Sequence, residues 1–333
     1  MPTLIVDASA PDPDAIARGA ALLRDGRLVA FPTETVYGLG AHALDRHAVR
    51  RIYEAKGRPG YNPLIVHVAR EDDARALVAD WPESAHQLAH AFWPGPLTLI
   101  LRKRLVVPDE VTAGLDSVAL RVPAHPVALA LLNAAEIPVA APSANRSSEL
   151  SPTSARHVER SLGPRVDLIL DAGPTTVGIE STVIDLRGPR PIILRPGVLG
   201  PRELEPVVGA VEFAPRIDEA TAAPRASPGR LERHYAPRAR LILFDAAHAE
   251  AMERRIRELL GSDTRVGALL LHQINVEAET LVTMPNNPVD YARRLYATLH
   301  MLDDTGCDVV FVERVPEGPE WAGVRDRLER AAT

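Results

Sequence analysis

One stretch of this sequence decides the fold: Phe31-Pro32-Thr33-Glu34-Thr35-Val36-Tyr37-Gly38-Leu39-Gly40. An apolar run at residues 28–31 leads into a proline, and hydroxyl groups, one carboxylate, a tyrosine and two glycines follow it. Polar, glycine-bearing loops at the ends of strands are where open α/β sheets bind their ligands. We therefore expect a strand at residues 28–31 and a ligand-binding loop directly after it.

A basic motif, Lys56-Gly57-Arg58-Pro59, and a second apolar run at residues 62–67 follow this stretch. The chain contains only two lysines, Lys56 and Lys103, against thirty-six arginines. An ammonium group is a compact point charge that suits a cluster of phosphates, whereas a guanidinium group is a planar fork. Lys56 is therefore predicted to bind an anion as a loop cation that adds little to the core, against the alternative that it lies there by chance.

The composition is that of an ordinary globular protein with about two domains. The chain has 333 residues, of which 46% are hydrophobic and 25% charged, and a single core rarely grows beyond about 250–300 residues. Cys307 is the only cysteine, which excludes an intramolecular disulfide and a cysteine-based zinc site. No apolar run reaches the roughly 18 residues of a membrane span, and residues 1–7 carry no secretory signal. We expect a cytoplasmic protein that is not associated with a membrane.

Short apolar runs alternate with helical patterns over the first two-thirds of the chain. Strands are predicted at residues 4–6, 28–31, 64–68, 97–101, 117–122, 139–141, 168–170, 182–186 and 192–194. Helices are predicted at residues 14–24, 45–55, 72–79, 83–92, 126–135 and 153–161, with Asp45 as an N-cap. This order of elements implies a twisted, partly antiparallel α/β sheet.

A proline-rich linker is predicted at residues 210–238. It contains the pair His234-Tyr235, which either packs on a domain surface or forms a lid over a site. Beyond it, the pattern predicts strands at residues 241–244, 266–271, 281–283 and 309–312, and helices at residues 247–260, 288–303 and 324–332. The expected division is a catalytic domain at 1–209, the linker at 210–238, and a small α/β domain at 239–333.

Hydroxyls, amides and cations are the chemical groups that recur at the predicted strand ends. The chain has neither a P-loop nor the glycine fingerprint of dinucleotide-binding proteins, so dispersed groups would have to hold any nucleotide. Ser143 and Asn145 follow an apolar run and either contact a ligand or form a turn. Ser151 lies near a helix start, where main-chain N–H groups receive anions; the alternative is N-capping, which suits Thr153 better than Ser151.

Two arginines lie at predicted strand ends close to a proline, Arg121 in Arg121-Val122-Pro123 and Arg195 in Arg195-Pro196-Gly197. Either one alone would be read as a surface charge, but the repetition favours a shared role. Glu180 and Ser181 place a carboxylate and a hydroxyl at another strand start. His67 has no second histidine at metal-ligand spacing, and no nucleophilic triad is evident. These groups suit the binding and positioning of a phosphate-bearing substrate.

Together these motifs resemble the threonylcarbamoyl-AMP synthase family, whose catalytic domain is of the YrdC type, in its longer two-domain form. The matching segments are residues 31–40, 56–67, 93–98, 121–123, 142–145, 151–153, 180–185 and 195–197. The resemblance implies a twisted mixed-sheet YrdC-like domain with a deep cavity and a small Rossmann-like C-terminal α/β domain. It also implies a nucleotidyltransferase that makes threonylcarbamoyl-AMP and pyrophosphate from L-threonine, bicarbonate and ATP. A downstream tRNA threonylcarbamoyltransferase would use the product, and tRNA would not be bound directly.

The resemblance further implies a set of site residues. Threonine would be held by Thr35, His67, Arg121 and Ser181. ATP would be held by Lys56, Arg58, Asn62, Ser117, Ser143, Asn145, Ser151, Arg195 and Tyr235. Of these residues, Lys56 and Arg58 would be catalytic. Mg²⁺ would be bound through the ATP phosphates rather than by protein side chains, and no organic cofactor is expected.

The sequence departs from the family pattern in two places. Arg230-Leu231-Glu232 stands in the linker where the family often reads Met-Lys-Tyr, which bears on how the linker and Tyr235 reach the site. Glu320-Trp321-Ala322 replaces a more glycine-rich, apolar stretch, and this change concerns the small domain more than the chemistry.

Three other functions are weighed against this one. A nucleic-acid-binding module is disfavoured by the net charge of −6 and the 4% of aromatic residues, because such proteins use basic surfaces and aromatic stacking. A related carbamoyltransferase that builds hydrogenase cofactors carries cysteine-rich zinc motifs, which a chain with one cysteine lacks. The third function is a regulatory protein that binds nucleotide without turnover, and the pairs Lys56 and Arg58 and Ser143 and Asn145 argue against it.

Overall fold

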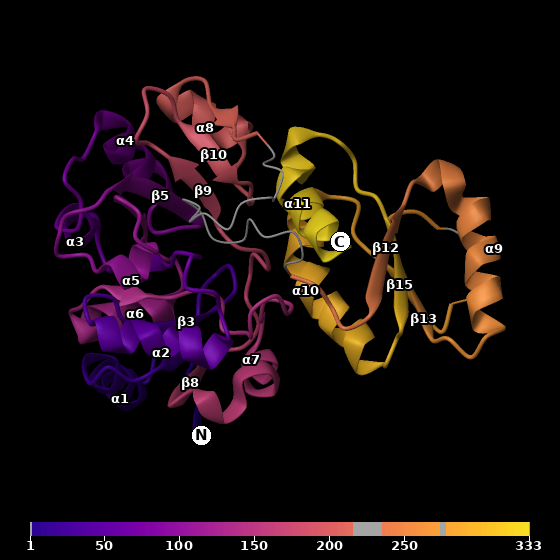
Figure 1. Ribbon diagram of the computed structural model, residues 1–333, viewed down its shortest axis with the longest axis horizontal. Coiled ribbons are helices and arrows are strands. Elements are labelled where there is room, and N and C mark those ends of the chain that lie inside the picture. Colours follow the sequence, from indigo (N-terminus) through magenta and orange to yellow (C-terminus); the bar gives the residue numbers. More distant parts are fainter. Residues whose placement is uncertain (1, 216–234, 274–277, 333) are drawn as a thin grey trace.

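The structure is a computed structural model that describes residues 2–215, 235–273 and 278–332. Within these residues the strands form one eleven-stranded sheet and one four-stranded sheet. The two sheets belong to two α/β units that lie side by side (Figure 1). Tyr235 is described, but His234 and the linker segment Arg230-Leu231-Glu232 lie outside the described residues.

The large sheet mixes parallel and antiparallel neighbours, as predicted. Its order is β1-β8-β2-β3-β7-β4-β6-β5-β9-β10-β11. For example, β4 runs parallel to β6, whereas β5 runs antiparallel to it. The strands are β1 (Thr3–Ile5), β2 (Val29–Pro32), β3 (Tyr37–His42), β4 (Ile65–His67), β5 (Leu97–Arg102), β6 (Ser117–Arg121), β7 (Val139–Ala140), β8 (Leu168–Asp171), β9 (Thr182–Asp185), β10 (Ile192–Arg195) and β11 (Glu212–Phe213).

The helices of the first unit begin and end at recognisable signals. Asp45 caps α2 as predicted, because its side chain accepts a hydrogen bond from the His47 N–H, and Gly57 ends the helix in the left-handed conformation with φ of 59°. That conformation favours glycine, which has no Cβ to clash. The helices are α1 (Pro13–Arg24), α2 (Arg46–Lys56), α3 (Glu71–Arg75), α4 (Glu83–Phe92), α5 (Asp109–Thr112), α6 (Pro126–Ala135), α7 (Ala155–Leu162) and α8 (Pro201–Val208).

The predicted ligand-binding loop after β2 is shorter than expected. Residues 37–42 form β3, which pairs antiparallel with β2, so only Thr33 to Val36 make the turn. Thr33 Oγ1 accepts hydrogen bonds from the N–H groups of Thr35 and Val36 and donates to the Val36 carbonyl. Gly40 is required inside the strand, because a Cβ there would lie 2.8 Å from the Phe31 ring. Neighbouring side chains therefore explain this glycine, and a turn does not.

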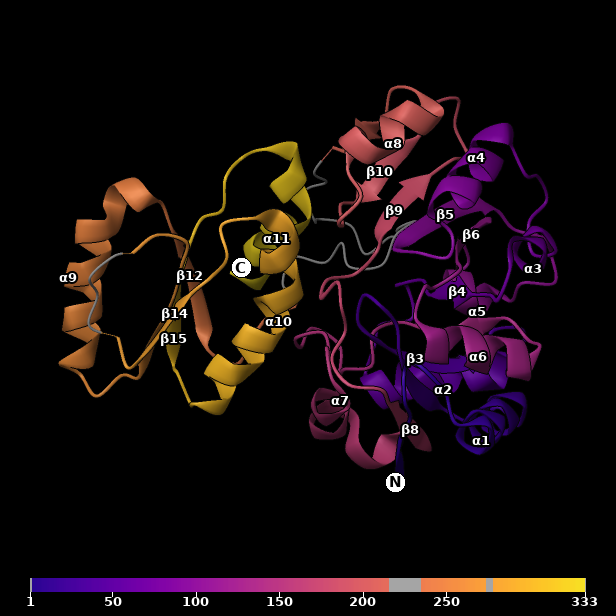
Figure 2. The ribbon, with the colours of Figure 1, turned by 180° about the vertical axis from the view of Figure 1, so that it is seen from behind.

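The second unit is built on a parallel sheet with the order β12-β15-β13-β14. Its strands are β12 (Arg240–Phe244), β13 (Val266–Leu270), β14 (Thr280–Thr283) and β15 (Val309–Glu313). Its helices are α9 (Ala249–Leu260), α10 (Pro288–Asp304) and α11 (Ala322–Ala331). Both views place α9 on the outer side and α10 and α11 on the side that faces the first unit (Figures 1 and 2). The expected small α/β architecture is confirmed.

An apolar cluster joins the two units. Val36, Leu150 and Ile179 of the first unit are buried together with residues of the second unit, including Tyr296 on α10 and Trp321 just before α11. The remaining large clusters of the first unit lie entirely within it. No helix in the described ranges is long and apolar enough to cross a membrane.

Candidate active site

A cavity lies where several strands of the large sheet end. Eight of the thirteen predicted site residues line it: Thr35, Arg58, His67, Arg121, Ser143, Ser181, Arg195 and Tyr235. The other lining residues are Thr33, Val36, Gly38, Pro63, Ile65, Ala141, Pro142 and Glu180. Segments that are far apart in the sequence thus meet in one place.

Arg121, at the end of β6, forms a buried ion pair with Glu34. Its Nη2 donates to Glu34 Oε1 at 2.6 Å, its Nη1 donates to Thr35 Oγ1 at 3.0 Å, and its Nε donates to the Gly95 carbonyl at 3.1 Å. The Ala124 N–H donates to the other oxygen of Glu34. These contacts use three of the five N–H groups of the guanidinium. Among the described residues nothing bonds the second N–H of either terminal nitrogen, and such a pair suits a carboxylate.

Ser181 and Arg195 are held together because β9 and β10 are antiparallel neighbours. Arg195 Nε and Nη2 donate to the Ser181 carbonyl at 3.1 and 3.0 Å, and Nη2 also donates to Ser181 Oγ at 3.1 Å. Thr98 Oγ1 lies 2.8 Å from Ser181 Oγ. The side chains of Ser181 and Arg195 are both buried, so their positions are fixed before any ligand binds.

Lys56 lies behind the wall of the cavity. It is the last residue of α2, only 2% exposed, and its ammonium group donates to the main-chain carbonyls of Ser143 and Asn145. Burial, and then the charge of Arg58, lowers the pKa of Lys56 well below its usual 10.5. The expectation of a loop cation that adds little to the core is therefore wrong. Lys56 holds the segment that carries Ser143 and Asn145.

Three buried cations around the cavity hydrogen-bond only to uncharged oxygens in the described chain. Arg58 donates to the carbonyls of Asn62 and Pro63 at 3.1 and 2.9 Å, and burial lowers its pKa to about 10. Lys56 and Arg195 likewise donate to carbonyls and a hydroxyl. Buried charges are normally paired with opposite charges, so this cluster indicates an anionic ligand.

Three buried polar atoms near the cavity have no hydrogen-bond partner within the described ranges. They are Asn62 Nδ2, His67 Nδ1 and Asn145 Oδ1. Buried polar atoms almost always have partners, so these atoms mark places where a ligand or water would bind. Burial, and then the charge of Arg121, lowers the pKa of His67 to about 3, so its imidazole is neutral at physiological pH.

Five predicted site residues do not line the cavity. Lys56, Asn62 and Asn145 lie directly behind residues that do, and Ser151 contacts the lining residue Glu180. Ser117 begins β6 whereas Arg121 ends it, so four residues of strand, or about 13 Å, separate them. No contact within the described part of the chain brings Ser117 to the cavity.

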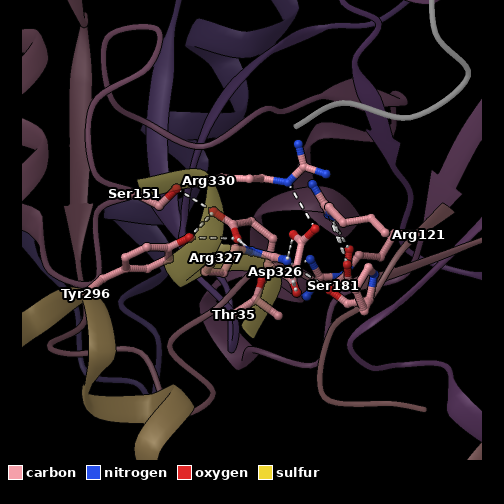
Figure 3. Close-up of polar contacts among 11 residues, drawn as sticks. Thr35, Arg121, Ser151, Ser181, Tyr296, Asp326, Arg327 and Arg330 are labelled. Atoms are coloured by element: carbon pink, nitrogen blue, oxygen red, sulfur yellow. Dashed lines mark hydrogen bonds and ion pairs between the residues drawn. The ribbon is translucent and has the colours of Figure 1, made fainter. Parts of the chain in front are cut away.

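Glu180 is a site residue that the sequence analysis did not assign a role. Its carboxylate accepts hydrogen bonds from Ser151 Oγ, from Tyr296 OH at 3.2 Å and from Arg327 Nε at 2.7 Å. Figure 3 shows Ser151, Tyr296 and Arg327 converging on this point from different elements. Burial alone would raise the pKa of Glu180, but the charges of Arg327 and Arg195 outweigh it and hold the pKa at about 2.

The described residues contain no group of three or more histidine, cysteine, aspartate or glutamate side chains that could hold a metal ion. The two carboxylates that adjoin the cavity, Glu34 and Glu180, are both bonded to arginines. This set of donors fits a Mg²⁺ ion that arrives on phosphates rather than one held by protein carboxylates.

The mixed sheet and its cation-lined cavity define an anion-binding α/β protein of the YrdC type with an appended parallel α/β domain. A family model described as "Telomere recombination", for Sua5, YciO and YrdC proteins, matches residues 21–197, and one described as "Threonylcarbamoyl-AMP synthase, C-terminal domain" matches residues 200–333. The chain therefore belongs to the threonylcarbamoyl-AMP synthase family, and the resemblance seen in its sequence is confirmed.

Relatives and solved structures support this assignment over nearly the full chain. The threonylcarbamoyl-AMP synthase of Pyrococcus abyssi is 44% identical over 94% of this chain and 92% of its own length. That of Bacillus subtilis is 41% identical over 97% and 94%. The crystal structure of P. abyssi Sua5 complexed with L-threonine covers 100% of this chain and 98% of its own, with 41% identity and a TM-score of 0.94.

Proposed function

We propose that this protein is an L-threonylcarbamoyladenylate synthase, which joins L-threonine, carbon dioxide from bicarbonate, and ATP. The observation that carries this proposal is the cluster of three buried cations, Lys56, Arg58 and Arg195, whose hydrogen bonds within the described residues all go to uncharged oxygens. The phosphates of ATP supply the missing negative charge. The relatives' name and the threonine complex of P. abyssi Sua5 support the same activity.

Threonine binds at the end of the cavity that contains Arg121. The two remaining N–H groups of Arg121 receive its carboxylate in bidentate fashion, while Glu34 keeps the guanidinium in place. Thr35 and Ser181 offer hydroxyls, and the neutral His67 offers a ring nitrogen, Nδ1, that has no partner within the described ranges. These groups orient the amine toward the ATP-binding end.

The reaction joins the three substrates in two steps. The neutral amine nitrogen of threonine bonds to the carbon of CO₂ while one C=O π bond opens and an N–H proton passes to water, which gives a carbamate. A carbamate oxygen then attacks the α-phosphorus of ATP, and the bond to pyrophosphate breaks, with pyrophosphate leaving as the anion. A Mg²⁺ ion that arrives on the ATP phosphates would offset part of their charge. The chain itself contributes orientation, charge neutralisation and a buried site that excludes water from a labile carbamate.

The product is a reactive mixed anhydride, so a second enzyme must collect it quickly. We propose that a tRNA threonylcarbamoyltransferase uses it, through a transient encounter and without direct binding of tRNA to this chain. The net charge of −6 is consistent with an enzyme that does not bind bulk nucleic acid itself.

The test is pyrophosphate release from ATP with L-threonine and bicarbonate each omitted in turn. Release that needs both substrates is the expected result. Release that is independent of threonine would overturn the proposed acceptor. Tight ATP binding with no release at all would favour a regulatory protein that binds nucleotide without turnover.

A further inference from the structure

Arg327 connects the C-terminal unit to the wall of the cavity. It lies on α11, its side chain is fully buried, and its Nε donates to Glu180 Oε2 at 2.7 Å. Its Nη1 donates to the Pro196 carbonyl at 2.9 Å and to Asp326 at 2.7 Å. Arg327 does not itself line the cavity, so any effect on ligands passes through the residues it holds.

The two points held by Arg327 flank the paired site residues Ser181 and Arg195. Glu180 directly precedes Ser181, and Pro196 directly follows Arg195. The guanidinium group of Arg327 therefore bridges the start of β9 and the end of β10, the two strand ends at which Ser181 and Arg195 line the cavity. Its carbon Cζ also lies 5.2 Å from the ring centre of Tyr235, a third lining residue.

Close backbone packing brings the C-terminal helices to these points. A Cβ on Gly323 of α11 would lie 2.4 Å from the Gly197 carbonyl oxygen, and a Cβ on Gly178 would lie 2.5 Å from the Ala292 carbonyl of α10. Both positions thus place main chain directly against main chain across the two units. This packing is independent of the charged contacts and positions Arg327 and Tyr296 at Glu180.

We propose that Arg327 is a positioning residue through which the C-terminal unit completes the active site. It fixes Glu180 and the main chain beside Arg195, so that Ser181 and Arg195 keep the geometry that receives substrate. This inference rests on the proposed function for the identity of the substrates. It assigns a role in the reaction to a residue on the last helix of the chain.

The physical reason is the competition between Glu180 and ATP for Arg195. Glu180 is buried, and after Arg327 the charge of Arg195 does most to lower its pKa. Without Arg327, the carboxylate would turn to Arg195, draw it away from Ser181, and neutralise a charge that the phosphates need. A lysine at 327 would retain the charge but could not bond Glu180 and Pro196 in the same forked geometry.

The experiment compares Arg327→Met, Arg327→Lys and the matched control Arg325→Met in the full chain. Arg325 lies on the same helix, but its hydrogen bonds go to the Pro316 and Gly318 carbonyls of its own unit. We expect Arg327→Met to lower kcat/KM about 100-fold and to move the acid limb of its pH profile to higher pH, because Glu180 loses a cation. Arg327→Lys should recover part of the activity, and Arg325→Met should match the wild type.

ATP affinity, measured by calorimetry without threonine, separates this inference from the proposed function. If the wild type releases no pyrophosphate, the proposed function fails, but a weaker ATP affinity in Arg327→Met still supports the positioning role. Wild-type kcat/KM and ATP affinity in Arg327→Met, with only a lower Tm, would overturn it.

Tyr296→Phe keeps the inference testable if Arg327→Met does not fold. This variant removes one hydroxyl contact to Glu180 and keeps the ring, so we expect kcat/KM to fall about 5-fold. Unchanged kcat/KM in both Tyr296→Phe and Arg327→Lys would overturn the proposal.

Discussion

The ion pair of Arg121 and Glu34 shows how one residue serves both the fold and the ligand. The side chains are 4% and 9% exposed, so removal of either charge leaves the other buried and unpaired, at a cost of about 3–5 kcal/mol. A variant that keeps the charge is therefore needed to examine binding separately from stability.

Arg121→Lys is such a variant. The ammonium group can still face Glu34, but it lacks the planar fork that receives a carboxylate. We expect the KM for threonine to rise about 10-fold or more, equivalent to about 1.4 kcal/mol, and the KM for ATP to change little. Steady-state kinetics with Arg102→Lys, an exposed residue on the neighbouring strand β5, provides the control. An equal rise in both KM values would show that Arg121 does not select threonine.

Lys56→Met is expected to impair stability as well as turnover. The substitution leaves the main-chain oxygens of Ser143 and Asn145 buried without their donor, which costs about 1–3 kcal/mol. Urea unfolding followed by circular dichroism measures this loss beside pyrophosphate release. Arg46→Met, at the exposed start of the same helix, should change the free energy of unfolding by less than about 0.5 kcal/mol. An unchanged urea midpoint in Lys56→Met would show that Lys56 adds little to the stability of the fold, as the sequence alone predicted.

Local motifs predicted the residues that line the cavity better than the contacts those residues make. Arg121 and Arg195 were singled out because each ends a strand before a proline, and both line the cavity. The partners of Glu180 were not predictable, because Tyr296 and Arg327 lie 116 and 147 residues away in the sequence. Contacts of that kind depend on how the two units pack against each other, and a local sequence pattern does not predict this packing.

At the scale of elements, the prediction succeeded where apolar runs are bounded by turn residues and failed where glycines have another purpose. The runs that form β2, β5 and β9 were located closely. Strand β3 was missed because Gly38 and Gly40 suggest a loop, although both lie inside the sheet. The short elements α5, α8 and β11 were missed as well, since their stability comes from tertiary packing more than from sequence pattern.

Helices α7 and α10 meet through two histidines whose rings are stacked. The ring centres of His157 and His300 lie 3.7 Å apart with an interplanar angle of 23°, and His300 Nε2 lies 3.1 Å from the Ser151 carbonyl oxygen. Burial, and then the charges of His300 and Arg160, lowers the pKa of His157 from 6.5 to about 3. The unfolded chain therefore binds more protons than the folded chain between these two values.

Stability should fall as the pH drops from about 6.5 toward 3, because this histidine is neutral in the folded state. One proton corresponds to about 1.4 kcal/mol per pH unit, and partial exposure of the ring reduces this to about 1. His157→Phe keeps a ring in the stack but cannot be protonated, so urea unfolding at about pH 7 and about pH 5 should differ less than in the wild type. The exposed His47→Phe serves as a control, and an unaltered pH dependence in His157→Phe would exclude this site as the source.

At the scale of the whole molecule, the two units share a core and a charged network. The cluster around Ile179 and Tyr296 draws side chains from both units, and Arg327 connects α11 to Glu180 in the cavity wall. The sequence predicted two α/β architectures in the correct order. It did not predict that residues of the second unit hold the cavity wall of the first unit. That arrangement depends on contacts between distant segments, such as Gly323 against Gly197.

Gly323→Ala tests whether the whole molecule behaves as one cooperative unit. The new methyl group would lie 2.4 Å from a main-chain oxygen of Gly197, which cannot move as a flexible side chain would, so α11 must shift away from the Arg195-Pro196-Gly197 segment. We expect a loss of about 1–3 kcal/mol in stability, and calorimetry should show one unfolding transition in the wild type and separated transitions in the variant.

Turnover of Gly323→Ala should fall about 10-fold or more, because a displacement of about 1 Å in α11 moves Arg327 away from Glu180. Gly188→Ala is the matched control, since a Cβ there has its nearest contact at 3.9 Å, and its unfolding and kinetics should equal those of the wild type. If Gly323→Ala instead unfolds in one wild-type transition with full turnover, then α11 does not need its close contact with Gly197, and the second unit contributes to the site by some other route than α11.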